Sequence, residues 1–374
     1  MNESKRHISL AAIDPYVQSN IVSPKEKINS SRNLVEWGDG NRYPDYLLDL
    51  VNNVATLRSI VLGNVDFIAG DDISIEALNE SLVDGVMNTK GDTIRQQVKD
   101  LAKDYEVYGG FALQVIRNYN GEVAEVYYID MRYLRMNKEC NVFYYSEHWA
   151  DGGRKNVVVY PAFMPNLNWA SLSEEERNRH ASSILFVKNV HSQVYPAPMY
   201  AASILACETE RAINEYHFNE IANGFAPQVI INFNNGDPGD KMKEEIENDV
   251  EEKFCGTNGR TFILSFNKDK GSATTFETLK VEDFGQKYQA LAERSRQEIF
   301  CSFRAIPLLF GLTAGTSTGF STDEFEQSFK LYNRTQIRPV QRMISEAYER
   351  IYGRTGVLTI KPFSLDNDNE TSVN

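Results

Sequence analysis

Residues that could carry out catalysis or bind a metal are few and scattered in this chain. The five histidines stand apart from the four cysteines, and no C-x-x-C pair indicates a zinc or redox site. Neither the G-x-S-x-G motif of hydrolases nor the H-E-x-x-H motif of zinc proteases occurs. We therefore expect structural histidines, reduced and mostly buried thiols in a cytoplasmic protein, no catalytic residue, no metal site and no cofactor.

Carboxylates gather at three places and could in principle hold a divalent cation. These places are Asp71 with Asp72, Asp249 with Glu251 and Glu252, and the 366–368 stretch. Solvated acidic faces are the commoner explanation, and a nuclease would need several carboxylates to converge. Gly109 and Gly110 could suggest a phosphate loop, but no G-x-x-x-x-G-K-S/T motif is present, so we interpret them as a turn.

Composition narrows the class of protein. The chain has 374 residues, 42% of them hydrophobic and 24% charged, which is typical of a globular protein with a sizeable core. Its net charge of −13 argues against a regulator that grips DNA by releasing counterions. The acidity is consistent with solubility alone or with a surface that lets DNA pass. No apolar run reaches the roughly 18 residues of a membrane span.

The first half of the chain has the pattern of a mixed α+β body. Apolar residues from Tyr46 to Val65 recur at helical spacing and predict one helix, and Thr93–Val107 predicts a second. The Asn-Gly dipeptide in 118–121 predicts a hairpin between two strands. The expected strands are 111–116, 123–129, 142–145, 157–160 and 184–187, with a short capped helix after Ser173.

The second half alternates long helices with a small αβ module and a loop. Helices are expected over 199–222 and 284–303, the second ending before Pro307. Between them, strands at 228–233, 261–266 and 275–281 surround an acidic helix at 241–254. Residues 308–321 contain three glycines and no Lys or Arg, and a loop of this length is typically functional. The last helix, 322–352, is kinked or split by Pro339.

One continuous pattern runs from Glu298 through Pro307 to Gly311 and goes on with a flexible loop and a helix that contains Ile337-Arg338-Pro339. This pattern resembles the portal proteins of long-tailed bacteriophages. The resemblance is strongest over 190–352, although Pro196 stands where the family carries glycine. It implies a ring-forming α+β fold with the following parts: a flexible N-terminal arm (1–30), an α+β wing (31–195), a stem helix (196–224), a clip (225–283), a second stem helix (284–306), a tunnel loop (307–321), a helix on the wing and crown side (322–352) and a short C-terminal tail (353–374).

The same resemblance implies a function. Such proteins form a closed ring, typically of about twelve subunits, at one vertex of the virion capsid. Double-stranded DNA is packaged and ejected through the channel. The implied partners are the terminase large subunit, a head-tail adaptor, the major capsid protein and the scaffolding protein, with no membrane and no enzymatic activity. The protein would be made in the bacterial host cytoplasm.

Two groups of site residues follow from the resemblance. The tunnel loop would meet the DNA through Leu312, Thr313, Gly315, Thr316, Ser317, Thr318 and Gly319. The clip would dock the motor and then the adaptor through Glu244, Glu245, Glu247, Asp249, Glu251 and Glu252. Two alternatives remain, namely another virion subunit of the head-closure or baseplate type and a DNA-processing enzyme. Ring stoichiometry separates the first from a portal, and metal-dependent turnover of DNA separates the second.

Overall fold

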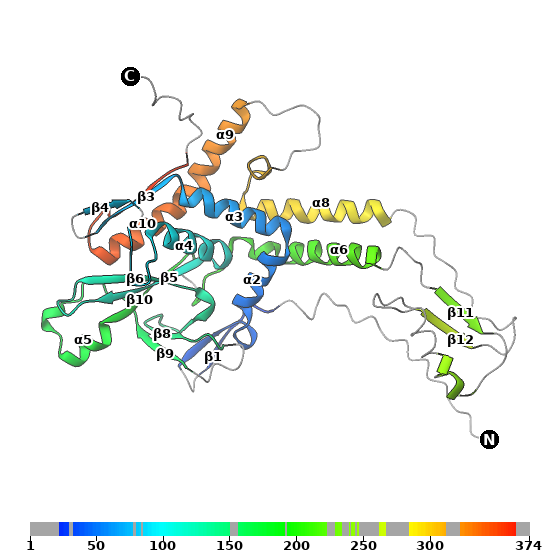
Figure 1. Ribbon diagram of the computed structural model, residues 1–374, viewed down its shortest axis with the longest axis horizontal. Helices are drawn as coiled ribbons and strands as arrows, with labels where there is room; N and C mark the ends of the chain where they lie inside the picture. The colour runs from blue at the N-terminus through cyan, green and yellow to red at the C-terminus, as the bar shows by residue number, and fades with distance from the viewer. Residues whose placement is uncertain are drawn as a thin grey trace. The chain divides into compact units, whose positions relative to one another are not determined.

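The computed structural model describes residues 22–29, 33–77, 80–83, 85–149, 156–190, 193–222, 229–233, 239, 241–243, 245–246, 262–266, 284–311 and 322–363. The chain divides into two compact units, Met1–Glu208 with Arg296–Asn374 and the intervening Thr209–Ser295 (Figure 1). Helices and mostly antiparallel sheets are both present in the described ranges, so the predicted α+β class is confirmed.

Two helices open the core of the first unit where the sequence predicts one. α2 spans Tyr43–Asn53 and α3 spans Ala55–Ala69. Val54 between them is fully buried and has an extended backbone, with φ −109° and ψ 110°. The prediction of a continuous helix is therefore wrong at Val54. No Pro or Gly marks the break, and tertiary packing of a β-branched residue overrides the helical pattern there.

The centre of the first unit is a three-stranded sheet covered by α4 (Ile94–Tyr108). Thr93 caps the helix by accepting from the Gln96 amide at 3.3 Å, and Gly109 ends it at φ 87°. β5 (Gly110–Arg117) and β6 (Val123–Ile129) form the predicted hairpin, and β10 (Ser182–Lys188) pairs with the other edge of β5. α4 packs on β5, and α3 packs on α4, which forms the main core.

A five-stranded antiparallel sheet has the order β1-β2-β7-β8-β9. Its strands are Glu26–Asn29, Leu34–Trp37, Leu134–Met136, Val142–Tyr145 and Val158–Pro161. The prediction of an irregular arm over 1–30 is wrong for β1. Its backbone pairs with β2, and the Glu26 carboxylate accepts from the Tyr195 amide at 2.8 Å, two tertiary contacts that the local sequence does not encode.

A third sheet joins distant parts of the chain in the order β13-β3-β4, made of Leu358–Lys361, Asp72–Ala77 and Glu80–Val83. The tail predicted for 353–374 is therefore a strand at β13. Gly70, at φ 65°, makes the close approach possible, because a Cβ there would lie 2.2 Å from the Lys361 carbonyl oxygen.

The first unit also contains shorter helical elements. The 3₁₀ turns before residue 180 in the described ranges are η1 (Asp39–Asn41), η2 (Met131–Tyr133) and η3 (Trp169–Ser171), and the capped helix predicted after Ser173 is α5 (Glu174–His180). Ser173 and Glu176 form a full capping box.

The long helices are close to their predicted bounds. A 3₁₀ turn, η4 (Met199–Ser203), replaces the expected first turn of α6 (Ile204–Ala222). α8 (Phe284–Phe303) follows, then η6 (Pro307–Phe310). The predicted last helix is α9 (Thr322–Tyr332), a π-helical turn (Asn333–Ile337) and α10 (Arg338–Tyr352).

α6 and α8 run side by side within each unit (Figure 1). In the first unit the Ser203 and Ser302 hydroxyls are 2.9 Å apart. In the second unit the rings of Tyr216 and Tyr288 stack at 4.9 Å. The second unit also contains β11 (Val229–Phe233) and β12 (Phe262–Phe266), which are parallel and therefore require a crossover connection.

Candidate functional site

Most of the sequence-predicted site residues lie outside the described residues. This holds for the tunnel-loop set from Leu312 to Gly319 and for the clip set apart from Glu245, which is exposed on a helical turn. The structure does describe the two chain ends that flank 312–321. These are the C-terminal end of α8 with η6, and α9 with its π-turn. The candidate site is built from these flanks.

The end of α8 has a Schellman motif with an unusual residue at its key position. The Arg304 amide donates to the Cys301 carbonyl at 3.0 Å, and the Ala305 amide donates to the Phe300 carbonyl at 2.9 Å. Arg304 has φ 51°, the left-handed region in which glycine is normally found. A side chain there costs about 1 kcal/mol. The chain therefore leaves α8 through a strained residue whose guanidinium is exposed.

Aromatic rings anchor both flanks on α3. The Phe310 ring, in η6, lies 6.2 Å from Phe67 and 5.9 Å from both Phe300 and Tyr332, measured between centroids. Gly63 on α3 leaves room for this ring, since a Cβ at that position would lie 2.7 Å from Phe310 Cε1. The two ends of the 312–321 segment are thus held in one aromatic cluster.

A buried hydrogen-bond chain ties the end of α9 to α3 and α4. The Tyr332 hydroxyl donates to Asn64 Oδ1 at 2.6 Å, and Asn64 Nδ2 donates to Glu106 Oε2 at 2.8 Å. Burial raises the pKa of the Glu106 carboxyl to about 7, and burial also raises the pKa of Tyr332. The end of α9 is therefore fixed by a network that includes a carboxyl able to titrate near neutrality.

The π-turn lies directly before Pro339, where the sequence predicts a kink. Proline has no amide hydrogen, and its ring crowds the carbonyl four residues earlier, here that of Thr335. The π-turn widens the helix at this point, and the Thr335 hydroxyl donates to the Leu331 carbonyl at 2.8 Å. The prediction that Pro339 perturbs this helix is confirmed, and the form of the perturbation is a π-turn.

One feature of α9 and α10 escaped the sequence analysis. Lys330, Arg334, Arg338 and Arg342 follow one another at intervals of four and are all exposed. The signal was present in the sequence, because residues four apart share a helix face.

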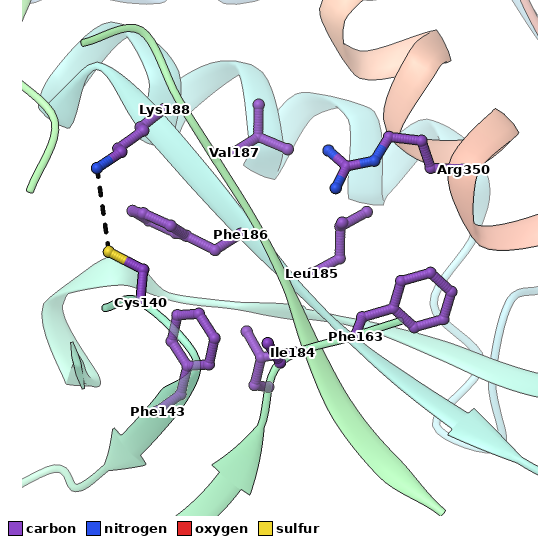
Figure 2. Close-up of a pocket in the computed structure, with 10 residues that line it drawn as sticks. Cys140, Phe143, Phe163, Ile184, Leu185, Phe186, Val187, Lys188 and Arg350 are labelled. Carbon is purple, nitrogen blue, oxygen red and sulfur yellow. Dashed lines mark hydrogen bonds between the residues drawn. The ribbon is translucent and has the colours of Figure 1, made fainter. Parts of the chain in front are cut away.

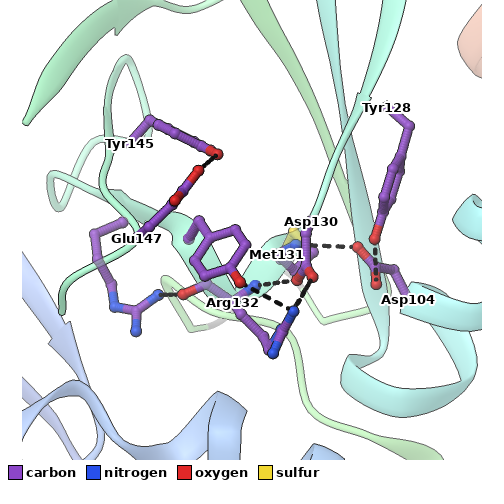
Figure 3. A network of polar contacts seen from close by, with 9 residues as sticks. Asp104, Tyr128, Asp130, Met131, Arg132, Tyr145 and Glu147 are labelled. Atoms are coloured by element: carbon purple, nitrogen blue, oxygen red, sulfur yellow. Dashed lines mark hydrogen bonds and ion pairs between the residues drawn. The ribbon is translucent and has the colours of Figure 1, made fainter. Parts of the chain in front are cut away.

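Elsewhere in the first unit, a buried carboxyl has a structural role (Figure 3). Asp104 on α4 accepts from the Tyr128 hydroxyl at 3.0 Å and from the Met131 amide at 3.1 Å. Burial and the nearby charge of Asp130 raise its pKa well above the usual value. Asp130 itself pairs with Arg132 at 2.8 Å. These contacts attach η2 and β6 to α4, so we assign Asp104 to packing.

A hollow of about 280 Å³ lies against β8 and β10 (Figure 2). Phe143 and Phe186 line it, and Cys140 Sγ lies 4.0 Å from Lys188 Nζ at one end. Burial raises the pKa of the Cys140 thiol, which disfavours the reactive thiolate. The expectation of mostly buried thiols is wrong in the described ranges, because Cys207 is buried while Cys140 is half-buried and Cys301 is exposed.

Among the described residues, no cluster of three or more His, Cys, Asp or Glu side chains could hold a metal ion. No helix in the same part of the chain combines the length and apolarity needed to cross a membrane.

The same arrangement of helices and sheets is found in solved structures. A chain in the virion of a native gene transfer agent (GTA) particle is 14% identical, with a TM-score of 0.53 over 92% of this chain and 87% of that one. A chain in the neck of the native GTA particle, with C12 symmetry, is 15% identical, with a TM-score of 0.52 over 86% and 84%. The likeness establishes the fold.

A third similar structure is a portal protein of the HK97 phage family from Corynebacterium diphtheriae. It is 9% identical, with a TM-score of 0.49 over 85% of this chain and 93% of that one. No protein-family model and no curated protein matches the chain.

Proposed function

We propose that this chain is the subunit of a portal ring, through which double-stranded DNA enters and leaves a phage-like particle. The fold shared with chains of the GTA virion and neck supports the proposal, as does the resemblance of 298–311 and 337–339 to phage portals. The C12 symmetry of the GTA neck supports a ring of about twelve copies.

The observation that carries the proposal is the apolar surface of the helix pair α6 and α8. Leu205 is 61% exposed in the first unit. In the second unit Phe218 is 70% exposed and Leu291 is 45% exposed. Large apolar side chains on long paired helices favour side-by-side packing with further copies, and a head-to-tail interface that closes gives a ring.

The clip and tunnel-loop assignments are part of the same proposal. The acidic clip helix would dock a packaging motor, and the 312–321 segment, which has no Lys or Arg, would follow the duplex without gripping it. Reversing the charge of Glu244 and Glu245 should weaken motor docking and leave the ring intact, because exposed charge changes alter stability by less than about 0.5 kcal/mol.

Native mass spectrometry of the full chain without DNA tests the ring. We expect a closed oligomer of about twelve copies, weakened by Leu205→Glu with Phe218→Glu. A matched control places the same charges at Asn214 and Gln289, which are exposed polar positions on the same helices. Monomers alone over a wide concentration range would rule out the ring.

A further inference from the structure

The exposed face of α9, the π-turn and α10 carries a line of basic residues, Lys330, Arg334, Arg338 and Arg342. We call these four residues the basic stripe. Successive members are four residues apart, which is about 6 Å along a helix. The opposite face is buried through Tyr332, Val340 and Ile344, so the core fixes which way the stripe points. A straight row of cations therefore stands on a rigid element.

The π-turn helps keep this row straight. Four residues of an α-helix advance about 40° beyond a full turn, so three such steps would wind the row around the helix by about 120°. The π-turn contains Arg334 and ends one residue before Arg338, and its i→i+5 bonds make four residues less than a full turn. The step across the π-turn therefore rotates the row in the opposite sense to the two α-helical steps. This keeps the four side chains on one face of the helix.

Local ion pairs leave most of this charge uncompensated. Lys330 Nζ pairs with Glu326 at 3.2 Å. Arg334, Arg338 and Arg342 make no ion pair or side-chain hydrogen bond with any residue that the structure describes. Like charges four residues apart repel one another in an isolated helix. Three adjacent arginines without an ion pair to any described residue, in a chain of net charge −13, therefore point to an external anion.

The chemistry of the stripe favours a phosphate backbone over a second protein. Protein interfaces are built on an apolar core with charges at the rim. Here the polar Thr335 and Ser345 flank the arginines, and Leu331 is the large apolar side chain exposed beside them on the described helix. Arginine is the residue best suited to bind phosphate through paired N–H groups. A regular series of anions matches a regular series of guanidinium groups.

We propose that the basic stripe binds the phosphate backbone of double-stranded DNA independently of sequence, immediately after the segment assigned to the channel. The inference rests on the proposed portal function and adds a place where the duplex is held. The neutral segment at 312–321 lets the duplex slide. The stripe supplies a salt-dependent contact that keeps it positioned beyond that segment.

Binding of the full chain to a linear duplex of about 30 base pairs, titrated with salt, tests the proposal. The variant is Arg334→Gln with Arg338→Gln and Arg342→Gln. The control, Lys103→Gln with Lys138→Gln and Arg179→Gln, removes the same charge from exposed positions elsewhere. With about 0.9 counterions released per phosphate contact, the slope of log K against log salt should be less negative by about 2.7 in the stripe variant than in the parent. Affinity at about 0.1 M salt should fall on the order of a hundredfold, and the control should keep nearly the full slope.

Oligomeric state, measured on the same samples, separates this inference from the proposed function. If the parent protein stays monomeric, the proposed ring is contradicted. The difference in salt dependence between the parent and the stripe variant still shows whether the stripe binds DNA. If the parent does not bind the duplex, or if parent and stripe variant share one slope and affinity, the stripe does not contact DNA. If the stripe variant alone fails to assemble while its DNA binding is unchanged, the arginines meet another copy of the chain and the proposal is overturned.

Discussion

Replacing Glu106 by Gln should make the protein more stable in a pH-dependent way. Glutamine keeps an oxygen that can accept from Asn64 Nδ2, so the chain from Tyr332 through Asn64 is preserved. What changes is the ability to ionise. The carboxyl is 4% exposed, and burial raises its pKa from 4.5 to about 7.

The sign and size of the effect follow from linkage. Below pH 4.5 the carboxyl is protonated in both the folded and the unfolded chain, and ionisation costs the parent nothing. As pH rises toward 7, the unfolded chain loses this proton while the folded chain keeps it, so the stability of the parent falls. Above about 7 the loss is complete. It is about 3 kcal/mol, from 1.36 kcal/mol for each of roughly 2.5 pKa units.

Urea unfolding of both proteins, followed by tryptophan fluorescence at several pH values and one protein concentration, measures the effect. The free energy of unfolding of Glu106→Gln should exceed that of the parent by about 3 kcal/mol at pH 8 and by much less near pH 5. Other titrating groups, including Asp104, cancel in the difference.

Tyr332→Phe is the matched control. It removes a hydrogen bond from the same network and should cost about 1 kcal/mol at every pH. A stability gap between Glu106→Gln and the parent that stays constant from about pH 5 to 8 would refute the linkage argument.

Three further predictions concern the contact of Gly70 with β13, the end of α8 and the 312–321 segment. Gly70→Ala should destabilise by more than about 2 kcal/mol, because the new Cβ would meet the Lys361 carbonyl, and amide exchange should accelerate in β13; unchanged exchange there would contradict the close approach. Arg304→Gly should be more stable to unfolding than Arg304→Ala by about 1 kcal/mol and should have the higher melting temperature, since glycine adopts the left-handed backbone without strain. Equal melting temperatures would mean that the backbone at this position stores no strain. Thr316→Lys with Thr318→Lys should leave the ring intact but slow packaging of a single tethered DNA, more at low salt; an unchanged rate at all salt concentrations would show that the segment does not meet DNA.

Local signals in the sequence predicted much of the fold. The strand 123–129 was predicted to the residue, because an Asn-Gly turn fixes where a hairpin begins. α4 and α5 carry their own caps at Thr93 and Ser173, and their N-terminal ends fell where these residues stand. Each of these signals lies within a few residues of the feature that it predicts.

The misses share a different origin. β1 and β13 have four residues each and exist because a partner strand supplies their hydrogen bonds, which for β13 lies nearly three hundred positions earlier in β3. The break at Val54 depends on burial, and the buried Glu106 network joins three helices. The tunnel-loop and clip assignments remain predictions, and the basic stripe could have been found from its spacing alone.

The pairing of α6 with α8 has a consequence for how this protein can be rebuilt. The chain leaves the first unit at Glu208 and returns at Arg296, and within that unit Ser203, the residue directly before α6, is hydrogen-bonded to Ser302 of α8. Residues 209–295 are therefore an insertion whose two junctions are neighbours, the arrangement in which domains can be exchanged with little strain on the host. A short αα-hairpin turn could close the first unit without them. The same junction could accept the corresponding segment of a protein with the same fold, so this segment could be exchanged as one piece.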